Sequence, residues 1–498
     1  MTVLSPTWRL LFVLVLQFAK PVSSRTLRRQ KEGLTLAIVN STLSLLNDDH
    51  HGNPVVPTNA LSSLTSVSDF KTISTLMIQL LVEEAEEHEG MTNVKTTTRT
   101  TTTWEIRKDK TTTTKNFFVG STSNRHAKAS LYRCKGQIVV VLHDYQKGLW
   151  YEIKPNSQGH SVVSVIADAE IARIGPAALD QAENSPWMVL LPATKKSETK
   201  KQSLQPRTTE TTTTTNKKDD SVVHVPKRRS LLRAWFPSRW WSRDFHGMTM
   251  VDILVVWTHD AECAKSLLPA ACDVSTMTHQ NMMLAVHFFI EETNAIFRNS
   301  GLQLKLRLAG GRQVQCQETT FQRALVDLKE RRIPKVQEYR EEFQADVVMM
   351  LMDGTWDYPE TGIAYNNYDH VDADYMYSVV AIQYTSVWYL PAHELGHNFG
   401  CSHDRGTVNM CSDMEKSNYG YRDPRGQFRT IMSYPCQARQ CDDIHGLYTT
   451  NNKMDCPLIP YFSNDRSDVR YFGASLGDQA NNCAAQIERV KHRVANLY

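Results

Sequence analysis

The second half of this 498-residue sequence predicts a mixed α/β fold. Two observations lead to that prediction. Apolar runs of strand length alternate with a longer segment of helical periodicity from residue 246 onwards. A histidine-rich stretch at residues 393–404 then has the pattern of a helix followed by a sharp turn. We therefore expect a sheet with this helix packed against it.

The predicted elements follow one another along the chain. Residues 251–258 form a compact apolar strand, and residues 277–301 show helical apolar spacing that ends at a glycine. Further strands are expected at residues 302–310, 344–352, 362–365 and 377–384. Because proline is tolerated only in the first turn of a helix, Pro391 implies that the last helix begins near Leu390 or is kinked there.

The stretch "HELGHNFGCSHD" at residues 393–404 contains three histidines at a chemically meaningful spacing. His393 and His397 are four residues apart and lie on one face of a helix. A continuing helix could not bring His403 to the same point, but Gly400 can adopt the left-handed conformation that ends helices. Three neutral imidazoles that converge in this way form a zinc site with one open coordination position.

The same histidine spacing also arises without catalysis. A bare histidine pair four residues apart occurs by chance or on a solvated helix face. A purely structural zinc usually has four protein ligands, often cysteines. The glycine, the third histidine and the acid Glu394 beside the first histidine favour a catalytic zinc.

The N-terminus reads as a secretory signal peptide at residues 1–24. Arg9 supplies positive charge, residues 10–19 are the apolar core, and Val22 and Ser24 are small residues suited to cleavage after Ser24. The apolar core is too short to span a membrane, and no later segment approaches the required length. The net charge of +3 gives no indication of a nucleic-acid partner. We expect a secreted, extracellular protein without a membrane span.

Ten cysteines fit an oxidising compartment. Nine of them lie between Cys263 and Cys483, so one of the nine either is free or pairs with Cys134. The sequence does not determine the pairing, although Cys263 and Cys272 could close a short loop. A second group of cysteines should form disulfides that constrain the segment around the histidines: Cys411, Cys436, Cys441 and Cys456.

Residues 25–229 differ in character from the rest. Threonine-rich tracts at residues 96–103, 111–114 and 208–215 bury too little apolar surface to fold alone, so we expect disordered segments there. They could carry O-linked sugars or serve as simple linkers. Residues 136–155 read as hairpin strands.

Processing signals accompany this region. Asn40 begins an N-glycosylation sequon. The basic residues 227–229 are a candidate cleavage site, weakened by Pro226, and basic runs are also usual in linkers. These features divide the chain into a propeptide at residues 25–229, a linker at 230–245 and a catalytic domain at 246–498.

The motif resembles the metzincin metalloproteases, and Asp404 after the third histidine resembles their adamalysin or reprolysin (ADAM-like) branch. That branch also has a methionine in a tight turn, and "RTIMSYPC" supplies Met432. Residues 459–478 resemble the closing segment of the branch, and the resemblance covers about residues 248–498. The N-terminal region resembles a reprolysin-type propeptide only loosely.

The resemblance implies a mixed five-stranded twisted sheet with long helices and a Met-turn, after a β-rich propeptide. It also implies a monomeric zinc endopeptidase, made as a zymogen, that hydrolyses protein or peptide substrates. One zinc ion, held by His393, His397 and His403, would activate a water and polarise the scissile carbonyl. Glu394 would act as the general base and pass the proton to the leaving amine.

Five further features carry weaker hypotheses. Met432 is an apolar floor for the histidines or an ordinary core residue. Tyr434 is a phenol donor to the developing oxyanion, as in other metzincin branches, or a core tyrosine. Asp404 anchors the turn after His403. Residues 362–365 form an edge strand that could pair with an extended peptide, or a short strand without substrate contact. Cys134 is a latency switch on the zinc or a disulfide partner.

Three functions remain in view. The first is the secreted endopeptidase, and the second is a narrower peptidase for short peptides. The third is an extracellular adhesion or matrix-binding protein that holds zinc without turnover. The intact Glu394 argues against the third.

Overall fold

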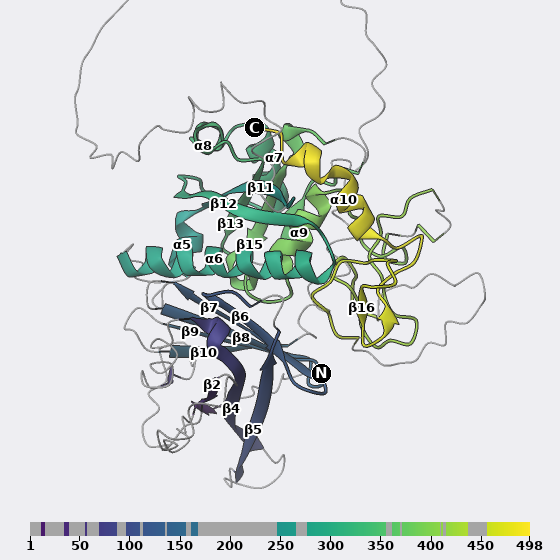
Figure 1. The fold of residues 1–498 in the computed structure, drawn as a ribbon. Coiled ribbons are helices and arrows are strands. Elements are labelled where there is room, and N and C mark those ends of the chain that lie inside the picture. The colour runs from purple at the N-terminus through teal and green to yellow at the C-terminus, as the bar shows by residue number, and fades with distance from the viewer. Residues whose placement is uncertain are drawn as a thin grey trace, which may run out of the picture.

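The structure is a computed structural model that describes residues 11–14, 34–38, 55–56, 69–86, 96–109, 113–134, 137–155, 161–167, 247–264, 276–354, 361–368, 371–408, 410–411, 415–436 and 456–498. These residues form an N-terminal β-sheet and a C-terminal α/β region, drawn in purple to blue and in teal to yellow in Figure 1. The long helix α6 (Thr276–Asn299) lies between them.

The C-terminal sheet has five strands in the order β12-β11-β13-β15-β14. Their bounds are β11 Thr249–Trp257, β12 Leu304–Gln313, β13 Val347–Met352, β14 Gly362–Ala364 and β15 Tyr377–Ala381. All neighbours pair in parallel except β14, which is antiparallel to β15 and forms one edge. The predicted mixed five-stranded sheet is confirmed, and each predicted strand falls in it.

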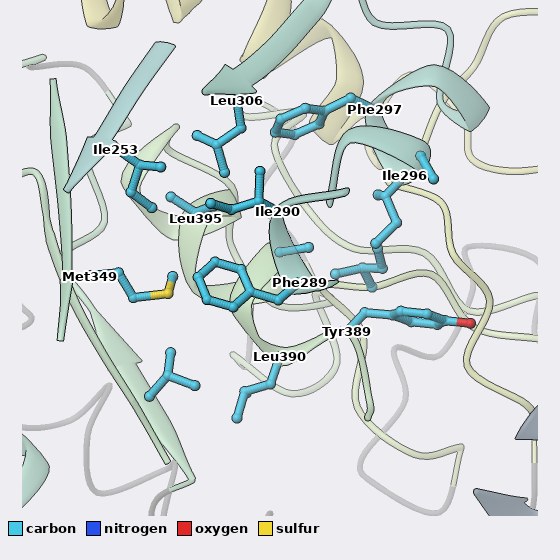
Figure 2. Packing of buried hydrophobic residues seen from close by; sticks show 14 of the residues in the cluster. Ile253, Phe289, Ile290, Ile296, Phe297, Leu306, Met349, Tyr389, Leu390 and Leu395 are labelled. Carbon is cyan, nitrogen blue, oxygen red and sulfur yellow. The ribbon is translucent and has the colours of Figure 1, made fainter. Parts of the chain in front are cut away.

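Helices cover both faces of this sheet, which explains why β11 and β13 are continuous apolar runs. On one face pack α6 and α9 (Leu390–Asn398), and on the other α7 (Phe321–Lys329) and α8 (Val336–Phe343). In Figure 2, Leu395 of α9 lies next to Ile290 of α6 on one side and Ile253 of the sheet on the other, and Phe289 of α6 faces Met349. The remaining elements are α5 His259–Ala264, α10 Cys483–Val494, β16 Arg470–Tyr471, β17 Ala474–Ser475, and the 3-10 turns η4 Ala373–Tyr375 and η5 Ile382–Tyr384.

The helix α9 begins at Leu390, so Pro391 lies in its first turn and kinks nothing. The two residues before it, Trp388 and Tyr389, have φ of 58° and 54°, which is uncommon for residues with a Cβ. Gly400 follows the helix with φ of 88°, where a side chain would be strained. This glycine reverses the chain as the sequence predicted.

The N-terminal sheet has ten strands among the described residues. Their bounds are β1 Leu11–Leu14, β2 Leu34–Ile38, β3 Val55–Val56, β4 Ile73–Glu86, β5 Thr96–Lys108, β6 Phe117–Ser121, β7 Ala127–Cys134, β8 Gln137–Asp144, β9 Leu149–Pro155 and β10 Ser161–Ala167, with the 3-10 turn η1 Phe70–Thr72 before β4. The predicted hairpin at residues 136–155 is confirmed, because β8 and β9 pair antiparallel.

One prediction about the threonine-rich tracts is wrong. Residues 96–103 are not disordered but form most of β5, which pairs with β4 along twelve positions. Threonine is β-branched and favours strands once a neighbouring strand supplies hydrogen-bond partners. In the second tract, Thr113 is buried and donates from its hydroxyl to the Val119 carbonyl at 3.1 Å. The third tract lies outside the described residues.

The N-terminal sheet packs one face onto α6. Side chains of β6 to β9 alternate between its two faces, and those facing α6 join the core of the α/β region. The rings of Phe117 and Phe288 meet at 6.1 Å, and Trp150 meets Tyr389 at 5.1 Å. The domain boundaries stay predictions, as does the signal peptide, part of which coincides with β1. Asn40 and residues 227–229 lie outside the described part of the chain.

Candidate metal centre

Three histidine side chains converge at the end of α9. The Nε2 atom of His403 lies 3.1 Å from that of His393 and 3.0 Å from that of His397. The helix presents the first two, and the reversal at Gly400 returns the third. Within the described residues, His393, His397 and His403 form the group of side chains that could hold a metal ion.

The opposite ring nitrogens of two histidines are held by the main chain. Nδ1 of His393 lies 2.8 Å from the Ile431 carbonyl, and Nδ1 of His397 lies 2.9 Å from the Cys401 carbonyl. An N–H that donates to these carbonyls leaves the Nε2 lone pairs directed at the common point. Both carbonyls belong to residues next to the predicted motif positions. Ile431 directly precedes Met432, and Cys401 directly follows Gly400.

His393 and His397 are suited to be neutral ligands. Burial, together with the charge of His403, lowers the pKa of His393 to about 3 and holds the pKa of His397 well below its usual value. Neutral imidazoles are what a metal requires. Among the described residues, the group offers three imidazole nitrogens, and such a set fits zinc better than calcium or magnesium, which prefer oxygen.

Glu394 lies beside this group and is buried. Burial raises the pKa of its carboxyl well above the usual value, and its Oε2 atom has no hydrogen-bond partner. A Cβ added to Gly362 of β14 would lie 2.5 Å from its Oε1, so the edge strand closely approaches this carboxylate. An unpartnered buried carboxylate next to three imidazoles supports a site in which a water would complete the arrangement.

Met432 packs directly against α9. It is fully buried, and a Cβ added to Gly396 would lie 2.5 Å from its sulfur. Gly396 stands between His393 and His397, so only a residue without a side chain lets the sulfur approach the helix at this point. Both hypotheses for Met432, an apolar floor for the histidines and an ordinary core residue, allow this position.

A buried network ties His403 to the Met-turn. The Asp404 carboxylate accepts hydrogen bonds from the Tyr434 amide at 3.0 Å and from Nη2 of Arg422 at 2.8 Å. It also accepts from the amide and hydroxyl of Thr407. Nε of Arg422 donates to the Tyr434 carbonyl at 3.0 Å. Asp404 therefore anchors the turn after His403 as predicted.

Sequence reasoning missed Arg422. It is a buried arginine 18 residues beyond Asp404 and belongs to no motif, so no pattern in the chain could have indicated it. The ring of Tyr434 lies 4.5 Å from the ring of His403, a position that both hypotheses for this tyrosine allow. Cys134 ends β7, and its side chain lies outside what the structure describes.

Comparison with known proteins agrees with this geometry. The Reprolysin_5 model of Metallo-peptidase family M12 matches residues 249–444, which contain all three histidines, Glu394 and Met432. The resemblance to the reprolysin branch is confirmed. The reprolysin match ends before α10, so the segment from residue 445 onwards lies beyond it.

Similar solved structures were also found. "Structure of a chaperone-substrate complex" is 18% identical with a TM-score of 0.36, and the match covers 51% of this chain and 37% of that one. Metalloproteinase-II from Bacteroides fragilis is 10% identical with a TM-score of 0.27, covering 69% of this chain and 85% of that one. The chain thus spans little more than a third of the first of these proteins. No curated protein matches.

Among the described residues, no helix is long and apolar enough to cross a membrane. Disulfides are present: Cys436 is bonded to Cys456, and Cys263 and Cys411 are also in disulfides. The first of these bonds lies in the group that was expected to staple the segment around the histidines.

Proposed function

We propose that this protein is a secreted zinc-dependent endopeptidase made as a zymogen. The observation that carries the proposal is the convergence of three Nε2 atoms beside a buried, unpartnered Glu394 carboxylate. The match of residues 249–444 to a metallopeptidase family supports the same reaction class. Disulfides in the described residues support an extracellular location.

Each residue of the site has a role in the proposal. His393, His397 and His403 hold the ion, which when bound would supply Lewis acidity toward a water and the scissile carbonyl. Glu394 takes up the proton from the attacking water and delivers it to the leaving amine. Burial raises the pKa of this carboxyl, which makes it a stronger proton acceptor than an exposed glutamate.

Two further residues extend the proposal to the substrate. The Tyr434 hydroxyl, on the ring next to His403, donates to the oxyanion as the carbonyl becomes tetrahedral. The edge strand β14 has a free side in the sheet order, and its Gly362 reaches Glu394. An extended peptide that adds to this edge would place its main chain beside the general base, which favours an endopeptidase.

The N-terminal sheet is proposed to keep the uncut protein inactive. This sheet covers α6 and contacts Tyr389, the residue immediately before α9. Cleavage at residues 227–229 would separate this sheet from the catalytic region. Cys134 stays a candidate ligand that could fill the open metal position in the uncut chain.

The test compares the wild-type protein with Glu394→Ala, before and after cleavage at residues 227–229, on an unfolded protein substrate. Because the general base contributes only to the chemical step, we expect Glu394→Ala to keep one zinc per chain and lose about 1000-fold in kcat/KM. Atomic absorption measures the zinc, and Glu394→Gln serves as the isosteric control.

The alternative is an extracellular zinc-containing adhesion or matrix-binding protein without turnover. It would replace the endopeptidase if the cleaved wild type bound zinc fully and hydrolysed no substrate. Loss of zinc from Glu394→Ala would instead show that this residue supports the fold of the site.

A further inference from the structure

Two cysteines that are distant in the sequence lie close together next to the metal centre. Cys401 lies between the ligands His397 and His403, and Cys483 is the first residue of α10. Both are free in the structure, and neither side chain is exposed to solvent. No motif identified in the sequence links them.

The contact is direct. Sγ of Cys401 lies 3.6 Å from the carbonyl oxygen of Cys483, and Sγ of Cys483 lies 3.1 Å from the carbonyl oxygen of Asn418. The thiols of Cys401 and Cys483 also hydrogen-bond to each other. The two sulfurs are therefore neighbours.

The remaining described cysteines indicate an oxidised protein. Cys436 and Cys456 form a disulfide, and Cys263 and Cys411 are bonded as well. The third free cysteine, Cys316, is half-buried near the start of α7 and contacts the Gln317 carbonyl instead of a thiol. Cys401 and Cys483 thus stand out as a thiol pair in a region that already contains disulfides.

We propose that Cys401 and Cys483 form a disulfide in the exported protein, which covalently joins the metal-binding loop to α10. The two thiols lose two protons and two electrons as the S–S bond forms, and a small-molecule disulfide such as oxidised glutathione is reduced to two thiols by exchange. The reaction needs no other co-reactant.

Oxidation removes the thiol hydrogen bonds of Cys401 and Cys483 but leaves the main-chain contacts around them in place. The Asn418 carbonyl that loses the Cys483 thiol still accepts from the Ser402 amide at 2.8 Å. The Cys401 carbonyl continues to hold Nδ1 of His397. Because no acceptor becomes buried and unpartnered, the bond costs little in polar contacts.

The bond would stabilise the metal centre by cross-linking the chain next to it. It closes the chain between residues 401 and 483, a separation of 82. That segment includes the Met-turn and the Asp404–Arg422 pair. A cross-link over such a loop restricts the unfolded chain and favours the arrangement in which His397 and His403 meet.

The experiment uses the full chain produced by secretion and kept in oxidised glutathione. Free thiols are labelled with N-ethylmaleimide in denaturant without reductant, and peptides are then identified by mass spectrometry. We expect a cross-linked peptide pair that contains Cys401 and Cys483, both unlabelled. Cys316 should be labelled, and the Cys436–Cys456 pair should be found linked.

Labelled Cys401 and Cys483 beside an intact Cys436–Cys456 bond would overturn the proposal, as would linkage of either to another cysteine. A second measurement compares thermal unfolding. Cys401→Ser/Cys483→Ser is expected to unfold on the order of 10 °C below the wild type, whereas the control Cys316→Ser should not differ from it. An unchanged unfolding temperature for the double variant would also count against the bond.

Discussion

At the scale of single residues, burial decides the chemistry of the site. Removal from water makes the charged form of a histidine or a carboxylate unfavourable. The same effect lowers the pKa of His393 and raises that of Glu394, one residue further along the helix. The motif places these groups together, but the core around α9 makes the imidazoles neutral and the carboxyl a weaker acid.

Replacement of Arg422 should strongly destabilise the protein, because this buried arginine pairs with the buried Asp404. Arg422→Met leaves the buried Asp404 carboxylate without its charged partner, at a cost of about 3–5 kcal/mol in unfolding free energy. Urea unfolding measures the loss. The double variant Arg422→Met/Asp404→Asn removes both charges and should be more stable than the single variant. Equal or greater damage in the double variant would show that the ion pair is not the cause.

At the scale of elements, local rules explain where helices begin and end. Pro391 suits the first turn of α9, and Gly400 suits the reversal after it. The entry into α9 follows no such rule, because Trp388 and Tyr389 adopt left-handed backbone without being glycine. Stacking of Trp388 on Tyr384 at 4.5 Å and packing of Tyr389 against Trp150 offset that strain.

The start of α10 offers a test of an ordinary helix cap. The Asn482 side chain accepts a hydrogen bond from the Ala485 amide at 3.0 Å. Asn482→Ala should therefore cost about 1 kcal/mol of unfolding free energy, while Asn482→Asp should retain most of it. Thermal unfolding of the three proteins measures the difference. Equal losses for both variants would mean that the cap contributes nothing.

At the scale of the whole molecule, a buried charge pair lies where the N-terminal sheet meets the catalytic region. Nζ of Lys128 on β7 lies 3.8 Å from Oε1 of Glu292 on α6 and 3.4 Å from the Tyr389 hydroxyl. The Ser130 hydroxyl also donates to Glu292. Burial raises the pKa of Glu292 to about 7, against the attraction of Lys128. The same burial lowers the pKa of Lys128.

The raised pKa of Glu292 predicts a pH-dependent interface. A carboxyl whose pKa is higher in the folded protein contributes stability below the unfolded value near 4.5, and this is lost as pH rises through about 7. Relative to the wild type, Glu292→Gln should therefore gain stability between pH 5 and pH 8, by at most about 3 kcal/mol. Urea midpoints at the two pH values measure it. A difference that does not change with pH would contradict the raised pKa.

Much of the catalytic region could be predicted because its patterns are local. Apolar runs identify the strands β11 and β13 buried on both faces, and helical apolar spacing identifies α6, which packs against both sheets. The convergence of the three histidines could be predicted for the same reason, since His393 and His397 share one helical face and Gly400 permits the reversal that returns His403. For residues 96–103, composition was a poor guide, because the pairing strand β4 lies elsewhere in the chain.

The sequence by itself determined the elements of the catalytic sheet, the convergence of the three histidines and the place of Glu394 beside them, because helix periodicity and glycine conformation act within a few residues. Only the tertiary structure decided which distant groups meet. Arg422 reaches Asp404, Cys401 contacts Cys483, and Lys128 joins Glu292, across stretches of intervening chain that no periodicity spans. Such contacts depend on how the layers pack, and packing is set by the shape and volume of the whole core.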